Sequence, residues 1–262
     1  MQHQQPLGQA VAPRDSTPIG SGVSGIAQRI SSAISVGMLS VGERLPSEAE
    51  LASQFGVAVA TLRKALAKLR AQGIVETRRG RNGGTFVVQA PFPSARLLQE
   101  SLRSTSVVAP RDSFAEHTAV SGAAARLAAE RTAQDQRTRL AEFAFAAREA
   151  ATARDRSMAD SRFHFEVAVL SHSQRLLNAE QRLQSELSPF LWCEEICRAS
   201  AQAAFTAHLD IVMAIEQRRP DEAQRLAMAH VAENGRLIIQ GKLALNRASL
   251  RIGAGGREDG AG

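Results

Sequence analysis

The sequence predicts a mostly α-helical protein in which an N-terminal winged helix-turn-helix precedes an all-α antiparallel helical bundle. Two observations carry this prediction. Apolar residues recur at helical spacing along nearly the whole chain, whereas strand-like segments occur only in a short basic region before residue 90. Residues 89–94 then interrupt both patterns with two prolines, which stop helices and strands alike.

The breaks in these patterns divide the chain into five expected segments. Its length of 262 residues suits two ordinary domains, and an apolar content of 44% provides for a core in each. The polar start and the glycine-rich end are predicted to be flexible. The segments are a disordered tail (1–22), a winged helix-turn-helix domain (23–90), a linker (91–110), a helical domain (111–245) and a flexible tail (246–262).

Three helices are predicted in the first domain. An apolar face at helical spacing begins at Val23 and forms the first helix. Ser47 and Glu50 make a capping-box pair, so the second helix starts directly after Ser47. The third runs from about Val59 to a C-cap at Gly73 and buries a leucine stripe. A short turn thus separates two helices, as in a helix-turn-helix.

Strands and further helices follow in order. Residues 74–79 and 85–88 have strand character and flank a glycine-rich loop, which predicts a two-stranded wing. Beyond the prolines almost no strand signal remains, and alanine-rich amphipathic stretches predict the bundle. The stretches are 112–132, 135–154, 157–171, 175–198, 201–218 and 221–243.

Positive charge is concentrated in the first domain. Residues 21–92 contain nine basic and four acidic side chains, so they hold +5 of the net charge of +6. A basic domain attached to a nearly neutral one is typical of a nucleic-acid reader with a second function. We therefore expect double-stranded DNA as a partner.

The third helix and the wing supply the candidate DNA contacts. Arg63 lies off the leucine face of the third helix and can read guanine, while Thr61 and Lys64 suit a phosphate or a base edge. At the wing tip, glycines permit a close approach to a groove, and arginines favour a narrow minor groove. The wing candidates are Arg78, Arg79, Arg81 and Gly83.

Four side chains of the second domain form a candidate metal site. Asp160 and His164 are four residues apart, which places both on one face of a helix. His208 and His230 lie on two later helices that can pack antiparallel across the turn at Pro220. Three imidazoles and one carboxylate suit a borderline cation such as zinc or nickel, with positions left open for a ligand.

Cysteine content and hydropathy predict a protein of the cytoplasm. Cys193 and Cys197 are the only cysteines, and they lie four apart within a helical pattern. A small-residue core fits them better than a thiol sensor, and no disulfide framework is needed. No signal peptide or membrane-spanning segment is expected.

The first domain resembles the DNA-binding domain of the GntR family of regulators. In that family the residues that match Arg44, Thr61, Arg63 and the wing glycines contact operator DNA. Many members have Ser-Arg-Thr where this chain has Ala58, Val59 and Ala60, so its operator cannot be borrowed from them. The resemblance rests on residues 42–48 (GERLPSE), 51–52 (LA), 55–57 (FGV), 61–63 (TLR) and 79–87 (RGRNGGTFV).

The helical domain is similar to the FCD ligand-binding domain of FadR-type GntR regulators. Asp160, His164, His208 and His230 match the four metal ligands of that family. The resemblance implies a small organic acid as effector, bound at the metal. At the position where such domains commonly carry an arginine that helps to hold the acid, this chain has His117, which becomes the candidate effector-binding residue.

These patterns favour a metal- and ligand-dependent transcription factor, and the resemblance implies a homodimer on a pseudo-palindromic operator. Repression that the ligand relieves is the expected mode of action, and activation is the alternative. One alternative is a metal-dependent hydrolase or lyase with an accessory basic domain. It lacks support because the chain has no tyrosine and no further motif that would provide a general acid or base. A nucleoid-type protein without sequence preference is the third interpretation, and a salt titration would distinguish it.

Overall fold

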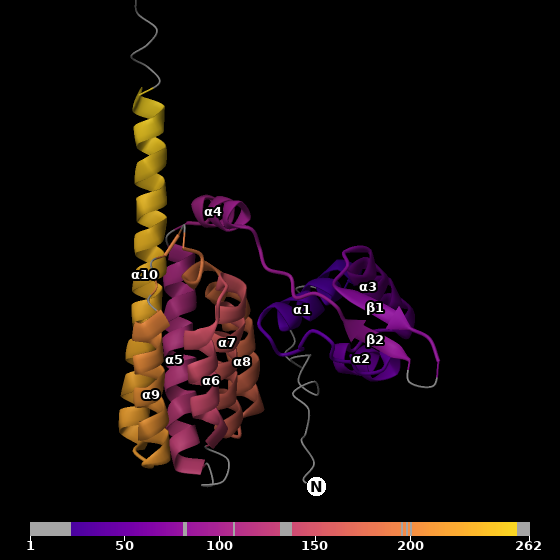
Figure 1. Ribbon diagram of the computed structural model, residues 1–262, viewed down its shortest axis with the longest axis horizontal. Helices are drawn as coiled ribbons and strands as arrows, with labels where there is room; N and C mark the ends of the chain where they lie inside the picture. The colour runs from indigo at the N-terminus through magenta and orange to yellow at the C-terminus, as the bar shows by residue number, and fades with distance from the viewer. Residues whose placement is uncertain are drawn as a thin grey trace, which may run out of the picture. The chain divides into compact units, whose positions relative to one another are not determined.

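The computed structural model describes residues 22–80, 83–106, 108–131, 138–194, 196–197, 199 and 201–255. Arg81 and almost all of the expected N-terminal tail lie outside the described residues. The chain divides into two compact units, Met1–Phe92 and Pro93–Gly262 (Figure 1). Among the described helices, none is long and apolar enough to cross a membrane.

The first unit is a winged helix-turn-helix. Its helices α1 and α3 pack together, and their apolar faces are fully buried, with Ile26, Ile30, Leu62 and Leu66 at most 1% exposed. In chain order its elements are α1 (Val23–Ser35), α2 (Glu48–Phe55), α3 (Val59–Ala71), β1 (Val75–Arg78) and β2 (Gly84–Val87).

The capping box that starts α2 is formed as the sequence predicts. The Glu50 amide donates to Ser47 Oγ at 3.3 Å, and the Ser47 amide donates to Glu50 Oε2 at 2.8 Å. At the start of α3, Ala58 cannot cap with its side chain. Helix α3 ends at Ala71 with its C-cap at Gln72, one residue before the predicted cap Gly73, which follows with φ of +69°. A left-handed residue at this position suits glycine.

The wing is a short antiparallel ribbon. Val75 pairs with Val87 and Arg78 with Gly84, so the first strand is shorter than predicted and the second is shifted by one residue. The loop before α2 lies along the edge of this ribbon, because the amide of Leu45 donates to the backbone oxygen of Thr85 at 2.8 Å. This loop contact fixes the wing against the start of α2.

The second unit is a helical bundle in which α10 packs along α5 (Figure 1). Two glycines allow this close approach: a Cβ at Gly122 would lie 2.5 Å from Met228 Cγ, and one at Gly235 would lie 2.7 Å from the Phe114 ring. The helices of the unit are α4 (Ala95–Ser104), α5 (Val108–Arg131), α6 (Thr138–Glu149), α7 (Ala153–Leu170), α8 (Gln174–Leu191), α9 (Ala201–Glu216) and α10 (Pro220–Gly255).

Three features of this unit differ from the sequence predictions. The stretch 91–110, expected to be a linker, contains α4, which is capped by Ser94 and buries Leu98 and Leu102. Helix α8 ends at Leu191, soon after Pro189, whose missing amide hydrogen weakens the last turns. Helix α10 continues to Gly255, through residues expected to form a flexible tail, because no proline interrupts it.

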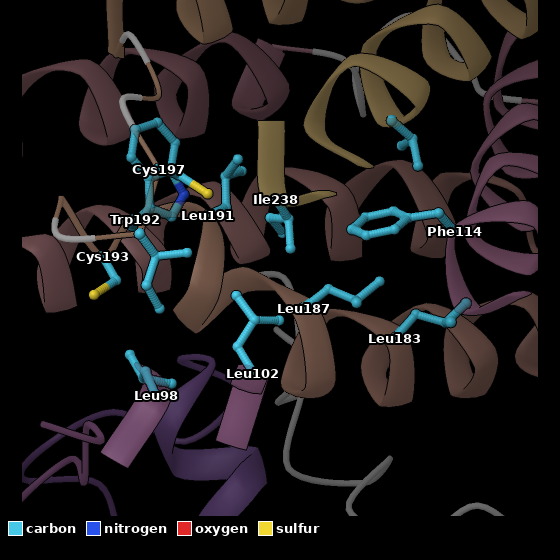
Figure 2. Close-up of a cluster of buried hydrophobic side chains, with 12 residues drawn as sticks. Leu98, Leu102, Phe114, Leu183, Leu187, Leu191, Trp192, Cys193, Cys197 and Ile238 are labelled. Carbon is cyan, nitrogen blue, oxygen red and sulfur yellow. The ribbon is translucent and has the colours of Figure 1, made fainter. Parts of the chain in front are cut away.

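The two cysteines therefore follow α8 and do not lie within a helix. Cys193 and Cys197 are 4% and 3% exposed and belong to a hydrophobic cluster with Trp192, Leu98 and Leu102 (Figure 2). They form no disulfide with any described residue, and burial beside the other thiol raises the pKa of Cys197 to about 12. A high thiol pKa disfavours the reactive thiolate, so packing is their role.

Gly241 offers a test of the α10 packing. A Cβ added at position 241 would overlap the backbone oxygen of Ile196, which cannot move as a flexible side chain can. We expect Gly241→Ala to lower the free energy of unfolding by about 1–3 kcal/mol, measured by urea denaturation, despite the gain in helix propensity. Gly122→Ala is the control, because Met228 can rotate away. Equal stability of the two variants would contradict the packing described.

Candidate metal centre and nucleic-acid interface

Three helices bring the four predicted metal ligands together. Asp160 and His164 occupy successive turns of α7, His208 lies on α9 and His230 on α10. Each of the four is at most 6% exposed. Their candidate ligand atoms, one from each residue, all lie within 4.8 Å of one another. Residues up to 70 positions apart in the chain thus converge on one point in the bundle interior.

The spacing between these atoms is that of a coordination site. His208 Nε2 lies 3.1 Å from His230 Nε2 and 3.6 Å from Asp160 Oδ1. The rings of His164 and His230 stack with centroids 5.3 Å apart. Asp160 Oδ1, His164 Nε2 and His208 Nδ1 are buried without a hydrogen-bond partner among the described residues. Buried polar atoms are normally satisfied, so the unpaired Asp160 Oδ1 and His164 Nε2 indicate a missing partner in the cluster, whereas His208 faces the cluster with Nε2 and not with Nδ1.

Burial also sets the protonation of the four side chains. It lowers the pKa of His164 and of His208 well below the ordinary value, and it lowers the pKa of His230 to about 4. It raises the pKa of Asp160 to about 7, although Trp192 partly offsets the rise. The imidazoles are therefore neutral, which is the form that donates a lone pair to a metal. A cation would supply the charge that makes the Asp160 carboxylate stable here.

The donor set fits a divalent cation of the borderline class. Three neutral imidazoles and one carboxylate are ligands shared by zinc and nickel, and hard cations such as magnesium prefer an all-oxygen set. The candidate ligands and their orphaned buried atoms are thus consistent with the site predicted from the sequence.

A buried carboxylate that the sequence prediction missed lies beside this cluster. Glu180 on α8 is 1% exposed, and its Oε1 is 2.7 Å from Nε2 of His117 and 3.7 Å from Nδ1 of His164. Ser121 donates to Oε2 at 2.9 Å, and Gln184 donates to Oε1 at 3.3 Å. One signal was present: Glu180 is the one charged side chain among the buried residues of α8.

These contacts hold Glu180 in its ionised form. Burial opposes the charge, but the electrostatic interaction and hydrogen bond with His117, with smaller contributions from His164 and Ser121, leave the pKa of Glu180 below its ordinary value. The candidate effector residue His117 is therefore engaged with a neighbouring carboxylate. Its other ring nitrogen, Nδ1, has no hydrogen-bond partner among the described residues.

A small cavity adjoins both groups. Ser121, His164 and Glu180 form its polar wall, and Phe163, Val167 and Ile211 contribute to its apolar wall. Its volume is about 10 Å³, which is room for about one water molecule. A larger ligand requires the surrounding helices or side chains to move.

The predicted DNA contacts lie on the first unit. Lys64 and Arg63 are exposed on α3, and Arg63 Nε donates to Glu48 at 2.6 Å. Thr61 is partly buried on the same helix. Arg44 is exposed on the loop before α2, where its backbone pairs with Phe86 of the wing.

The described wing residues are not equivalent. Arg79 is exposed, whereas Arg78 donates to Glu76 at 2.7 Å and stacks over the Phe86 ring at 4.5 Å. Gly83 lies in a tight turn, where a Cβ would be 2.5 Å from the backbone oxygen of Arg78. Position 83 therefore requires glycine for its backbone geometry. Arg81 lies outside the described residues.

Comparison with known protein families gives two matches that cover most of the chain. Residues 23–87 match the family described as bacterial regulatory proteins, gntR family. Residues 102–233 match the FCD domain. The two matches fall on the winged helix-turn-helix and on the helical bundle, respectively.

Named relatives are regulators. The chain is 47% identical over 228 residues to the HTH-type transcriptional regulator RmpR of Mycobacterium gastri, covering 86% of this chain and 83% of that protein. It is 31% identical over 216 residues to the Glc operon transcriptional activator of Escherichia coli K12, covering 79% and 84%. A crystal structure of a GntR-family regulator from Pseudomonas syringae pv. tomato DC3000 aligns with a TM-score of 0.47 at 18% identity, covering 93% and 94%.

Asp160→Asn tests the role of the buried carboxylate. Asn keeps the size of the side chain but has no carboxyl group to ionise, and burial disfavours an ionised carboxylate at this position. We therefore expect the variant in chelator to be at least as stable as the wild type in chelator. Added zinc should raise the Tm of the wild type and not that of the variant. Thermal melts with chelator and with zinc measure both effects. The exposed Asp112→Asn variant serves as control, and a variant stabilised by zinc as strongly as the wild type would contradict the assignment.

Proposed function

Because this chain belongs to the GntR family of bacterial regulatory proteins and carries an FCD domain, we propose that it is a metal- and ligand-dependent repressor. The chain is a DNA-binding transcriptional regulator and not an enzyme, since its relatives and both family matches are those of regulators. The hydrolase or lyase alternative is thereby set aside. The proposal concerns its metal, its effector and its mode of action.

The metal proposal rests on one observation, the convergence of four buried ligand atoms from α7, α9 and α10. Asp160, His164, His208 and His230 would hold a divalent cation, zinc or nickel. That cation would supply a positive charge in a low-dielectric interior, where the carboxylate of a small organic acid is attracted strongly. His117 and Glu180 then stand beside the effector.

The effector must distinguish two arrangements of the protein if it is to act as a switch. The metal ligands come from three separate helices, so a change in their spacing on effector binding moves these helices relative to one another. We propose that the effector-bound arrangement has the lower DNA affinity, which relieves repression.

On DNA, α3 is the helix we place in the major groove. Arg63, Thr61 and Lys64 would meet base edges and phosphates, Arg44 the backbone at the start of α2, and the wing a minor groove. Binding requires Arg63 to leave Glu48, an exposed ion pair of the kind that contributes little to stability. We also propose a homodimer whose two helices read half-sites about one helical turn, or a multiple of it, apart.

Metal content tests the first part of the proposal. Protein purified without chelator should contain about one equivalent of divalent metal by mass spectrometry. The His208→Ala/His230→Ala variant should lose it. His172→Asn is the matched control, because His172 is exposed and asparagine tolerates its positive φ of 51°. Absence of metal from the wild type and from the control would refute the site.

Arg63→Ala tests the reading helix. Against DNA selected by the wild-type protein from a random pool, we expect affinity to fall by about 10- to 100-fold, because a base contact contributes about 1–3 kcal/mol. Affinity for unselected DNA should change much less. Fluorescence anisotropy at several salt concentrations measures both, with the exposed Arg236→Ala as control. Unchanged affinity for the selected DNA would show that α3 does not read the operator through Arg63.

A further inference from the structure

The side chain of Glu180 is a negative charge built into the wall of the candidate effector pocket. It lies on α8, outside the set of four predicted metal ligands, and it forms a second buried group with His117 and His164 whose candidate ligand atoms lie within 4.8 Å of one another. It faces the small cavity together with Ser121 and His164. Any ligand that reaches the metal centre through this cavity therefore meets the carboxylate of Glu180.

The groups around that carboxylate form a donor set for an anion. His117 Nε2, Gln184 Nε2 and Ser121 Oγ lie 2.7, 3.3 and 2.9 Å from its two oxygens. Ser161 donates to Gln184 Oε1 at 3.1 Å, which turns the amide nitrogen of Gln184 toward Glu180. Several donors that converge on one buried carboxylate bind the charged form strongly. The carboxylate of Glu180 thus occupies these donors in place of an anion from solution.

We propose that Glu180 selects the effector by charge: it occupies the anion-binding donor set beside the metal centre, so the pocket accepts an acid with a single carboxylate and a neutral or cationic hydrogen-bond donor at its other end. This inference rests on the proposed function, because it assumes that the carboxylate of the effector goes to the metal. The second contact of the effector is then to an oxygen of Glu180.

Like-charge repulsion is the reason for the selection. A second carboxylate on the ligand would be buried next to Glu180, with its preferred donors already occupied. In a low-dielectric interior two such charges destabilise each other. A hydroxyl or ammonium group in the same place instead donates to Glu180, and the ammonium also offsets its charge.

Removal of the carboxylate should expose the donor set to an external anion. In Glu180→Ala, acetate should fill the space left beside His117, Ser121 and Gln184 and raise the Tm of the variant. Acetamide, which has the same shape and no charge, should raise it much less, and acetate should have little effect on the wild type. Melts are recorded on the full chain with zinc and with chelator. A variant that acetate stabilises no more than it stabilises the wild type would overturn the proposal.

Ligand titrations test the selection itself. Calorimetry on the zinc-loaded protein compares succinate, 4-hydroxybutyrate and 4-aminobutyrate, which share one carboxylate and differ at the other end. We expect the wild type to bind succinate at least about tenfold more weakly than the other two. Glu180→Gln should lose this difference, whereas Glu186→Gln, a change on the same helix in an exposed ion pair, should keep it.

The outcomes separate this inference from the proposed function. Zinc binding without rescue by acetate, or a preference against succinate that survives in Glu180→Gln, overturns the role of Glu180 and leaves the metal site standing. If neither the wild type nor any variant binds zinc, the metal site is refuted. The effect of acetate on the Tm of Glu180→Ala, measured in chelator, would still test the donor set in that case. A second equivalent of zinc that depends on Glu180 would show that this carboxylate is a metal ligand and would also overturn the proposal.

Discussion

The second unit is organised around the burial of polar ligand atoms that have no partner of their own. Asp160 Oδ1 and His164 Nε2 are buried without hydrogen bonds among the described residues. Unpaired buried polar atoms destabilise a fold, and the proposed cation bound between them would remove much of that cost. Because the four candidate ligands come from α7, α9 and α10, such a cation would join three helices at one point.

The same arrangement ties the metal centre to α4. Trp192, which follows α8, partly offsets the rise that burial causes in the pKa of Asp160. It also packs in the cluster that buries Leu98 and Leu102 of α4 (Figure 2). Lys242 of α10 is 2% exposed and donates to the Thr105 oxygen just after α4, at 2.5 Å. Helix α4 directly follows the first unit in the chain, so close packing connects the surroundings of Asp160 to the start of the helical unit.

Local patterns predicted the parts of this fold that depend on neighbours in sequence. The capping box at Ser47 and the pairing of Asp160 with His164 on one helical face needed only short spacings. Helix α4 was missed because its two buried leucines match a cluster built from distant helices, and the sequence analysis also ended α10 too early, near Leu243. Glu180 was missed because its partner His117 lies 63 residues away. A polar residue in an apolar helical face signals an exception but does not identify its partner.

Charge balance links the two buried carboxylates beside the candidate pocket, Asp160 and Glu180. Asp160 and Glu180, when ionised, carry two negative charges, which a divalent cation neutralises formally. An acid bound to that cation adds one negative charge to a closed, low-dielectric site, and a second acidic group would add another. A ligand that carries an ammonium group as well as its carboxylate adds none. In this proposal the two buried carboxylates disfavour further negative charge in the pocket, and Glu180 is the point of discrimination.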